Sequence, residues 1–368
     1  MTSEERRANR YARRKQKRED KKREKYQDND TFNKVFTYRN LTKSYRLCRR
    51  NVAWKASVQS YVFEAPLHIF QAYQELQNGI FQPIGFNEFD IVERGKFRHI
   101  KSVHIKERVV QRCLCDNALV PILSRSFIYD NGACLKDKGY TFSSNRIIEH
   151  LRRYYRLYGN EGYVLLFDFS KYFDSIDHNL LKQILRKYFS DEKIIEQTKQ
   201  FIDAFGDDKG VGLGSQISQI LALAASNKLD HYVKEKLHIK YYGRYMDDGY
   251  LIHPSKEYLQ YCLRKIEKIC NELGIVLNLK KTQIVKLSHG FTFLKVRYYI
   301  TSTGKIIKKL SPKSITRMRR KLKKFKTNEN IKPKNVYQSF QSWCAYAANF
   351  NLSRSVYNLK KLYKKLYA

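Results

Sequence analysis

The chain has 368 residues, and its 42% hydrophobic content is enough to bury a sizeable core in two or three subdomains. Its 72 lysine and arginine residues outnumber 35 aspartate and glutamate residues, so the formal net charge is +37, which indicates a polyanionic partner such as nucleic acid. No run of about twenty apolar residues is present, and charge fills the place of a signal peptide's apolar segment, so we expect a cytoplasmic protein without a membrane partner.

Residues 1–30 form a Lys/Arg/Glu block with almost no apolar content. We predict a basic tail that is disordered or forms a lone charged helix, and both RNA binding and simple solvation stay open as its role. Residues 31–160 are predicted to hold an N-terminal helical layer and short strands. Helical signals run from Val35 to about Gln82, strands cover Phe86–Val103, and helices cover Ile105–Leu123 and Ser143–Leu157.

Seven cysteines are scattered without a Cys-x-x-Cys pair, and the nine histidines show no metal-ligand spacing. Reduced thiols are therefore expected. Cys113 and Cys115 flank Leu114 in an apolar helix, so we predict that both are buried structural residues.

Residues 161–303 carry a regular succession of strand and helix signals. We predict a strand over 163–168, helices over 178–188, 192–205 and 216–236, a hairpin over 240–253, a helix over 255–273 and strands over 275–300. This order predicts an antiparallel sheet backed by helices, which is an α+β fold.

The C-terminal region is strongly basic. From Lys305 onward, eighteen lysines and arginines stand against one acid, Glu329. Apolar residues recur among these cations at steps of three and four, which is typical of amphipathic helices with a basic face. We predict that residues 304–368 form a helical basic subdomain suited to gripping a nucleic-acid duplex.

Two adjacent carboxylates, Asp247 and Asp248, lie between strand-like segments. Like charges this close raise each other's pKa unless a cation neutralises them, so the pair implies a divalent metal site. A polar hairpin turn is the plain alternative for such a dipeptide alone. About eighty residues upstream, an apolar run of buried-strand type ends in Asp168, where a third carboxylate can join the pair.

An Asp followed five positions later by an aromatic residue, then a Gly/Ser/Gln segment and Tyr-x-Asp-Asp, resembles the palm of a reverse transcriptase. Four other blocks are similar. Gly212–Gln219 stands where many bacterial members carry Pro-Gln-Gly, and Leu277–Thr282 resembles the family's Asn-x-x-Lys-Thr segment. Phe291–Lys295 resembles the primer-grip Phe-Leu-Gly, with Lys295 replacing the glycine, and Lys96–Ile100 with Lys106–Gln111 resembles the fingers. The resemblance spans roughly residues 55–350. It implies a right-hand polymerase with fingers within residues 31–160, a palm over 161–303 and a thumb over 304–368.

Leu213-Gly214-x-x-x-Ser218-Gln219 is most similar to the branch found in diversity-generating retroelements, and Ala133–Gly139 and Ser342–Ala347 agree with it. The resemblance implies an RNA-directed DNA polymerase that makes cDNA within such a retroelement of a bacterium or phage. A bacterial anti-phage defence reverse transcriptase that copies a non-coding RNA stays an alternative. A non-catalytic, maturase-like RNA-binding protein is disfavoured by the intact aspartates, and an RNA-templated RNA polymerase is disfavoured by the bulk of Phe173.

The chemistry implied is two-metal nucleotidyl transfer with Mg²⁺, or alternatively Mn²⁺. Asp168 and Asp247 are the expected bridging ligands and Asp248 a supporting acid. The backbone carbonyl of Phe169 is a further expected ligand, as in relatives. Phe173 is expected to abut the sugar 2′-carbon and to exclude ribonucleotides, while a place in the core is its alternative.

The remaining candidates bind substrates. Lys96 and Arg98 suit the phosphates of a deoxynucleoside triphosphate, because guanidinium forks and ammonium groups match phosphate oxygens. Lys281 is a candidate for protonating the departing pyrophosphate, with an ordinary half-exposed lysine as the alternative. Leu213, Gly214 and Gln219 are expected beneath the templating base pair. The implied partners are an RNA template, a DNA or RNA primer, and a small basic accessory protein or structured non-coding RNA.

Overall fold

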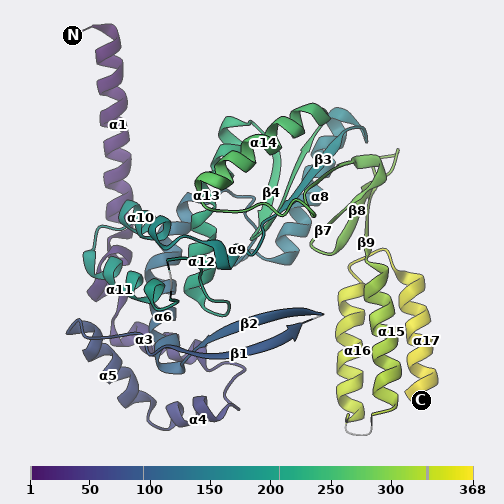
Figure 1. Ribbon diagram of the computed structural model, residues 1–368, viewed down its shortest axis with the longest axis horizontal. Coiled ribbons are helices and arrows are strands. Elements are labelled where there is room, and N and C mark those ends of the chain that lie inside the picture. The colour runs from purple at the N-terminus through teal and green to yellow at the C-terminus, as the bar shows by residue number, and fades with distance from the viewer. Residues whose placement is uncertain (1, 94, 207, 329–330, 368) are drawn as a thin grey trace. The chain divides into compact units, whose positions relative to one another are not determined.

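The computed structural model describes residues 2–93, 95–206, 208–328 and 331–367 (Figure 1). The chain divides into two compact units, each assembled from three separate segments. Unit 1 comprises Met1–Asp137, Phe169–Tyr232 and Glu267–Val276, and unit 2 comprises Lys138–Asp168, Val233–Ile266 and Leu277–Ala368. The boundaries that the sequence places at residues 30, 160 and 303 stay predictions.

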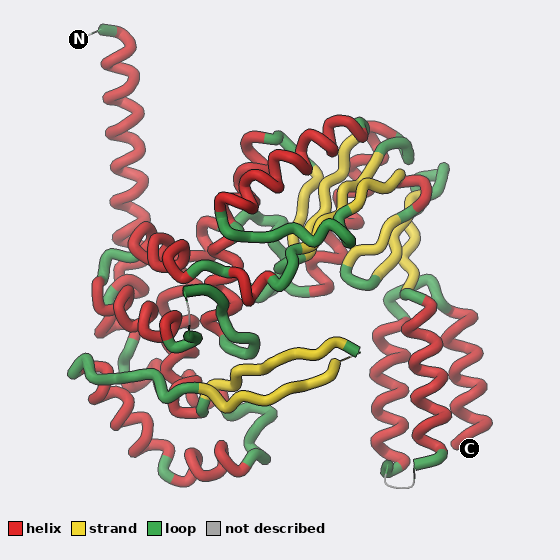
Figure 2. The backbone as a smooth tube through the Cα atoms, viewed as in Figure 1, coloured by secondary structure: helices red, strands yellow, loops and turns green. Residues whose placement is uncertain are grey.

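Unit 1 is mainly helical (Figure 2). Helix α1 (Ser3–Tyr26) begins with a capping box, in which Thr2 Oγ1 accepts the Glu5 N–H at 3.2 Å and the Glu5 carboxylate accepts the Thr2 N–H at 2.7 Å. Its described side chains are exposed almost throughout, so the structure has a lone charged helix here. The other helices and helical turns are η1 (Gln27–Asp30), α2 (Phe32–Val35), α3 (Tyr38–Cys48), α4 (Ala56–Phe63), α5 (Ala65–Gln77), α6 (Ile105–Leu114), η2 (Cys115–Leu119), α7 (Val120–Leu123), η3 (Ser124–Ser126), α9 (Tyr172–Ser175), α10 (His178–Tyr188), α11 (Glu192–Asp203), α12 (Gln216–Ala225) and α13 (Asn227–His231).

Unit 1 also contains the antiparallel hairpin of β1 (Phe86–Glu93) and β2 (Lys96–Val103). Its register runs from Phe86 opposite Val103 to Glu93 opposite Lys96. The predicted strands over Phe86–Val103 therefore form one two-stranded ribbon.

Unit 2 is built on a four-stranded antiparallel sheet. The strands, in the spatial order β4-β5-β3-β6, are β4 (Tyr241–Tyr245), β5 (Asp248–His253), β3 (Tyr163–Asp168) and β6 (Gln283–Lys286). Helix α8 (Tyr140–Tyr158) buries Ile147 and Leu151 in one core with Val164 of β3 and Ile252 of β5. An antiparallel sheet covered by a helix confirms the predicted α+β class.

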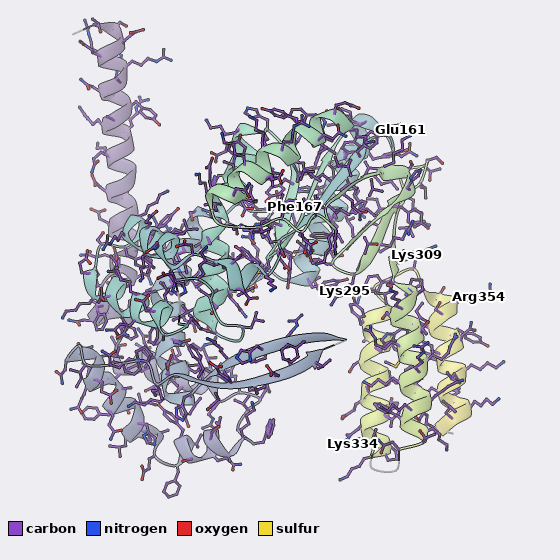
Figure 3. All side chains as sticks on the ribbon, in the orientation of Figure 1. Glu161, Phe167, Lys295, Lys309, Lys334 and Arg354 are labelled. Carbon is purple, nitrogen blue, oxygen red and sulfur yellow. The ribbon has the colours of Figure 1, made fainter. Side chains whose placement is uncertain are left out.

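A second sheet and a helical bundle complete unit 2. The sheet contains β7 (Phe291–Phe293), β8 (Val296–Ile300) and β9 (Ile306–Leu310), and the bundle contains α15 (Pro312–Lys326), α16 (Pro333–Ala347) and α17 (Ser353–Tyr367). The three helices share a core of Met318, Leu322, Phe340 and Leu359, while cations such as Lys334 and Arg354 are exposed (Figure 3). Helix α14 (Lys256–Glu272) and the helical turns η4 (Tyr232–Lys236) and η5 (Leu287–His289) complete the described elements.

Most predicted elements occur at the expected positions, and the long helices differ in detail. The helix predicted over 216–236 is divided at Ser226 into α12, α13 and the π-helical turn η4. The helix predicted over 143–157 begins earlier, at Tyr140, because Gly139 with φ of +141° supplies a break that the two serines do not.

Cys113 and Cys115 are fully buried, as predicted, and burial raises the pKa of Cys113 to about 12. Cys48, Cys262, Cys270 and Cys344 are also buried, whereas Cys134 is exposed. Among the described residues, no helix combines the length and apolarity needed to cross a bilayer.

Candidate catalytic site

The predicted Asp-Asp pair lies at the turn that joins β4 to β5. Tyr245 pairs with Asp248, so Met246 and Asp247 form a two-residue loop, and Met246 has a left-handed φ of +54°. Arg244, only 1% exposed, donates from Nη1 to the Met246 carbonyl at 2.7 Å. The buried Arg244 side chain therefore stabilises a left-handed conformation of Met246 that is energetically unfavourable for a non-glycine residue.

Asp168 is the last residue of β3 and lies directly opposite Asp248 in the β3–β5 ladder. Side chains of directly opposed residues are neighbours on the same face, and two like charges there destabilise the sheet. One residue further on, Gly249 faces Phe167, and a Cβ on Gly249 would overlap the Phe167 ring. The absence of that Cβ allows the two strands to pair where the carboxylates converge.

Asp168 is 4% exposed and is held by the segment that follows α14. Lys281 Nζ lies 2.6 Å from each Asp168 carboxylate oxygen, and Asn278 Nδ2 donates to Asp168 Oδ1 at 3.2 Å. The Asn278 backbone N–H also donates to the Asp168 carbonyl at 2.7 Å. These contacts fix both the main chain and the carboxylate of Asp168.

The three carboxylates leave excess negative charge at this end of the sheet. Burial, followed by the charges of Asp247 and Asp168, raises the pKa of Asp248 to about 7. Partial burial lowers the pKa of Lys281, but its hydrogen bonds to Asp168 and the charges of Asp248 and Asp247 raise it overall above the ordinary value. Lys281 is thus a cation in direct contact with Asp168, within a cluster of three carboxyl groups.

No group of three or more His, Cys, Asp or Glu in the described parts of the chain has a spacing that could hold a metal ion. The donor chemistry nevertheless fits Mg²⁺, because carboxylate oxygens are its preferred protein ligands. The raised pKa of Asp248 reports the electrostatic cost that a divalent cation would remove. Asp168, Asp247 and Asp248 therefore offer suitable donor atoms, although the structure does not bring the three carboxylates to a metal-binding spacing.

Phe169 and Phe173 belong to unit 1, in the segment that follows Asp168. Phe169 is 2% exposed, and its ring centroid lies 5.0 Å from that of Tyr172. Phe173 is only half-buried, although its carbonyl accepts the Val211 N–H at 2.8 Å. Phe173 is therefore not a fully buried core residue.

Leu213, Gly214 and Gln219 lie at the start of α12 in unit 1. Gly214, with φ of +113°, lies against the β2 backbone, where an added Cβ would stand 3.5 Å from the Lys101 carbonyl oxygen. Gly214 and Gln219 line a pocket of about 410 Å³, and Leu213 is not among its lining residues. Three cations line the same pocket: Arg50, Arg108 and Arg112.

Lys96 and Arg98 are residues of β2, opposite Glu93 and Ile91. Arg98 is exposed. The neighbouring His99 bridges two acids of β1, with Nδ1 2.8 Å from Asp90 and Nε2 2.9 Å from Glu88. The hairpin thus joins its strands by side-chain contacts next to the predicted phosphate-binding cation.

The departure from the primer-grip pattern falls in the turn between β7 and β8. Leu294 and Lys295 have φ of +49° and +67°, and Phe293 pairs with Val296 around them. Two left-handed residues are typical of a type I′ hairpin, which favours glycine. Lys295 therefore occupies a backbone conformation that favours glycine.

Residues 88–298 match the family described as reverse transcriptase (RNA-dependent DNA polymerase). The chain belongs to the reverse transcriptase family. This confirms the predicted family and enzyme class, and domains of this family generally use divalent metal ions, typically Mg²⁺.

The reverse transcriptase chain is similar to Protein YkfC of Escherichia coli (strain K12), with 27% identity over 177 residues that cover 44% of each chain. It thus spans less than half of this curated relative. Among solved structures, it is similar to telomerase from Candida albicans in complex with a TWJ fragment of telomeric RNA (14% identity, TM-score 0.48, covering 78% of this chain and 56% of that chain). Apo telomerase from Candida tropicalis is similar at 18% identity and a TM-score of 0.46, covering 61% of this chain and 48% of that chain.

Sequence reasoning did not assign site roles to Asn278, Arg244 or Met246. Asn278 was within reach, because it is the Asn of the Asn-x-x-Lys-Thr segment that also supplies Lys281. Arg244 gave a weaker signal, as a lone cation in an otherwise apolar strand before two acids. The positive φ of Met246 could not be predicted from the sequence, because residues with positive φ in such turns are usually glycine or asparagine.

Proposed function

We propose that this protein is an RNA-directed DNA polymerase that makes cDNA by two-metal nucleotidyl transfer. The observation that carries the proposal is the pairing of Asp168 with Asp248 beside Asp247, in a chain of the reverse transcriptase family. Its substrates are an RNA template, a DNA or RNA primer and deoxynucleoside triphosphates.

In this proposal, Asp168 and Asp247 hold two Mg²⁺ ions, with Asp248 and the Phe169 carbonyl in support. The ions, when bound, supply Lewis-acid activation of the attacking 3′-oxygen and charge neutralisation of the leaving pyrophosphate. Asn278 and Lys281 keep the Asp168 carboxylate in a single orientation. Lys281 stays protonated at neutral pH, since its pKa is raised, and is the proposed proton donor to pyrophosphate.

Substrate selection is assigned to unit 1. Phe173 presents its half-buried ring to the sugar and excludes a 2′-hydroxyl by bulk. Lys96 and Arg98 bind the triphosphate, and Gly214 and Gln219, with Leu213 beside them, support the templating base pair. The arginines of the pocket that Gly214 and Gln219 share suit the phosphates of the template strand.

We place the polymerase in the branch of diversity-generating retroelements on the strength of Leu213-Gly214 and Ser218-Gln219. An anti-phage defence enzyme is the alternative. Neighbouring genes discriminate between them: a variable repeat pair with a gene for a small basic accessory protein supports diversification, and a lone non-coding RNA gene supports defence.

The test is primer extension on an RNA template with the full-length chain and Asp247→Asn. The substitution removes a metal-binding charge and almost no volume, so extension should fall by about 10³-fold or more while RNA affinity stays within about twofold. Asp203→Asn is the matched control, because Asp203 is an exposed acid paired with Lys182.

Extension by Asp247→Asn at more than about a tenth of the parental rate would refute the metal assignment. Absence of extension by the parent itself on several RNA templates with Mg²⁺ or Mn²⁺ would favour the non-catalytic, maturase-like alternative.

A further inference from the structure

Unit 2 contains a second basic pocket, of about 790 Å³, between α8 and β9. Four of its lining residues are cations: Arg146, Arg152, Lys305 and Lys308. Its one acid, Glu149, already forms an ion pair with Arg153 at 2.6 Å, and this hydrogen-bonded contact lowers the pKa of the Glu149 carboxyl. The pocket therefore presents a strongly positive lining to a ligand.

The pocket is lined by α8 side chains other than those buried in the core with the catalytic sheet. Ile147 and Leu151 point into the core shared with β3 and β5, whereas Arg152, Glu149 and Asn145 line the pocket. Residues three and four apart share a helix face, so these two sets occupy different faces of α8. The pocket and the core contact therefore use different side chains of the same helix.

Contacts on both sides fix the walls of the pocket. Tyr155 Oη donates to the Ser302 carbonyl at 2.7 Å, and the Gly304 backbone lies so close to the Tyr155 ring that a Cβ there would overlap it. Lys308 and Asn351 are tied by two hydrogen bonds, from the Lys308 N–H to Asn351 Oδ1 at 3.3 Å and from the Asn351 N–H to the Lys308 carbonyl at 3.1 Å. The turn before β9 and the loop after α16 are therefore both anchored at the pocket.

Arg146 is a positioned cation. Its Nη2 donates to Nε2 of the buried His150 at 3.2 Å, and His150 Nδ1 lies 3.0 Å from Tyr250 Oη on β5. Because an arginine only donates, Nε2 accepts and Nδ1 carries the proton that Tyr250 accepts. The chain of contacts orients the guanidinium before any ligand arrives, which reduces the entropy lost on binding.

We propose that this pocket binds a single-stranded segment of RNA through its phosphates. Arg and Lys side chains are the groups that contact nucleic-acid phosphates, and Asn145 and Asn351 add amides for sugar or base edges. Ile148 and Ile306 give the lining an apolar part against which a base can lie, which an acidic peptide would leave unused. The volume falls within the range that accommodates drug-sized ligands such as a nucleotide.

This binding site is additional to the proposed polymerase function. It rests on that function in one respect, which is the choice of RNA as the negatively charged ligand. It would hold RNA outside the catalytic sheet, where α8, β9 and the α16–α17 loop meet. A bound strand there tethers the template without occupying the polymerising end.

The test uses the full-length chain with Arg146, Arg152, Lys305 and Lys308 all changed to Gln. The probe is a fluorescent uridine 12-mer RNA, titrated without nucleotides across a salt series. Affinity should fall by at least about tenfold, and the slope of log affinity against log salt should drop by about 2 to 3, as expected for loss of up to four single-strand phosphate contacts. Changing Lys236, Lys240, Lys256 and Arg264 to Gln removes equal charge from exposed positions of unit 2 and should leave affinity within about twofold.

A second variant, Arg152→Gln with Lys305→Gln, keeps the Arg146–His150 contact and guards against misfolding; it should lose about half of the slope change. Photocrosslinking with 4-thiouridine RNA should label peptides that contain residues 145–152 and 304–308. Equal losses in the pocket and control variants, or crosslinks confined to other peptides, would overturn the proposal.

Two competitors separate the sources of negative charge. Millimolar ATP should displace the 12-mer only weakly, because it offers phosphates at one locus. A glutamate 12-mer that binds the parent as tightly as RNA and loses affinity equally in the pocket variant would overturn the RNA assignment in favour of an acidic protein. Failure of the proposed polymerase function would show separately, as absence of primer extension by the parent on a pre-annealed short hybrid.

Discussion

Gly249 leaves the space that the Phe167 ring occupies beside the site. Gly249→Ala should destabilise the protein by about 1 to 3 kcal/mol, because the new Cβ would overlap the Phe167 ring within a paired, buried region of the sheet. Thermal unfolding followed by circular dichroism measures the effect. Combining Gly249→Ala with Phe167→Leu should restore part of the loss, and a double variant no more stable than Gly249→Ala would show that the ring is not the obstacle.

Phe173 is the residue on which the choice of sugar depends. Phe173→Ala should raise incorporation of ribonucleotides relative to deoxyribonucleotides by about tenfold or more, since the half-buried ring is proposed to fill the space of the 2′-hydroxyl. Matched single-nucleotide extension assays give the ratio. Tyr172→Phe is the control at the neighbouring position, and an unchanged ratio in Phe173→Ala would assign Phe173 to the core.

At the scale of residues, the sequence identifies charge and spacing but not contact. The positions of Asp168, Asp247 and Asp248 follow from strand-like runs and a turn, and the structure pairs Asp168 with Asp248. The grip of Asn278 and Lys281 on Asp168 joins residues more than one hundred positions apart, and no periodicity reports such a contact. The same limit applies to the pocket lined by Gly214 and Gln219, whose arginines come from α6 and from the turn that follows α3.

Among the elements, the β1–β2 hairpin contains a pH-dependent contact between its strands, made by His99 with Asp90 and Glu88. Hydrogen bonds to Asp90 and Glu88 raise the pKa of His99 above its ordinary value. A raised folded-state pKa means that the stabilisation is fully present below the unfolded-state value and is lost as pH rises through the folded-state value. Nuclear magnetic resonance titration of the full chain should therefore find His99 titrating above about 6.5.

The paired acids supply the control for this prediction. Changing Asp90 to Asn and Glu88 to Gln should return the pKa of His99 to its ordinary range. Hydrogen exchange of β1 and β2 amides should accelerate at high pH in the parent more than in His99→Gln. Identical exchange in both proteins across the pH range would show that the His99 contacts do not stabilise the hairpin.

Helix α15 offers two basic faces for comparison. Its core face carries Met318 and Leu322, and Lys321 is engaged with α16 through a 2.8 Å hydrogen bond to Ser339 Oγ. Changing Arg317, Arg320 and Lys324 to Gln should lower the salt slope of template–primer binding by about 2 to 3, because these exposed residues share the face most distant from the core.

The matched control is the face made by Arg319, Lys323 and Lys326, which loses the same charge. Its neutralisation should change the slope by less than about 1. Equal changes from both faces would indicate a diffuse field rather than a thumb that grips a duplex with one side.

Element positions were largely predictable because each depends on local spacing. The apolar run at 163–168 forms a buried strand, and the predicted hairpin over 240–253 forms β4 and β5. The interruption at Ser226 was not predictable from an apolar run of helical length. Ser226 Oγ accepts a hydrogen bond from Tyr172 at 2.8 Å and itself donates to Ala222, so a tertiary contact accompanies the break.

For the whole molecule, charge and family were readable from the sequence, and the division into units was not. The net charge of +37 comes from residues spread along the chain, and α1 and the C-terminal bundle hold large shares of it. Each unit, however, is assembled from three separate segments. Such assembly depends on long-range packing, whereas sequence patterns report neighbours within a turn or a strand.

The distribution of cysteines has a practical consequence for studying the chain. Six are buried, and Cys134 alone is exposed. Access rather than acidity distinguishes it, because partial burial raises the pKa of Cys134 as well. Brief treatment with a maleimide fluorophore at mildly alkaline pH should therefore give mainly singly labelled protein, with Cys134→Ser losing the label on peptide mapping. The native chain thus supplies its own attachment point for single-molecule fluorescence, without an engineered thiol.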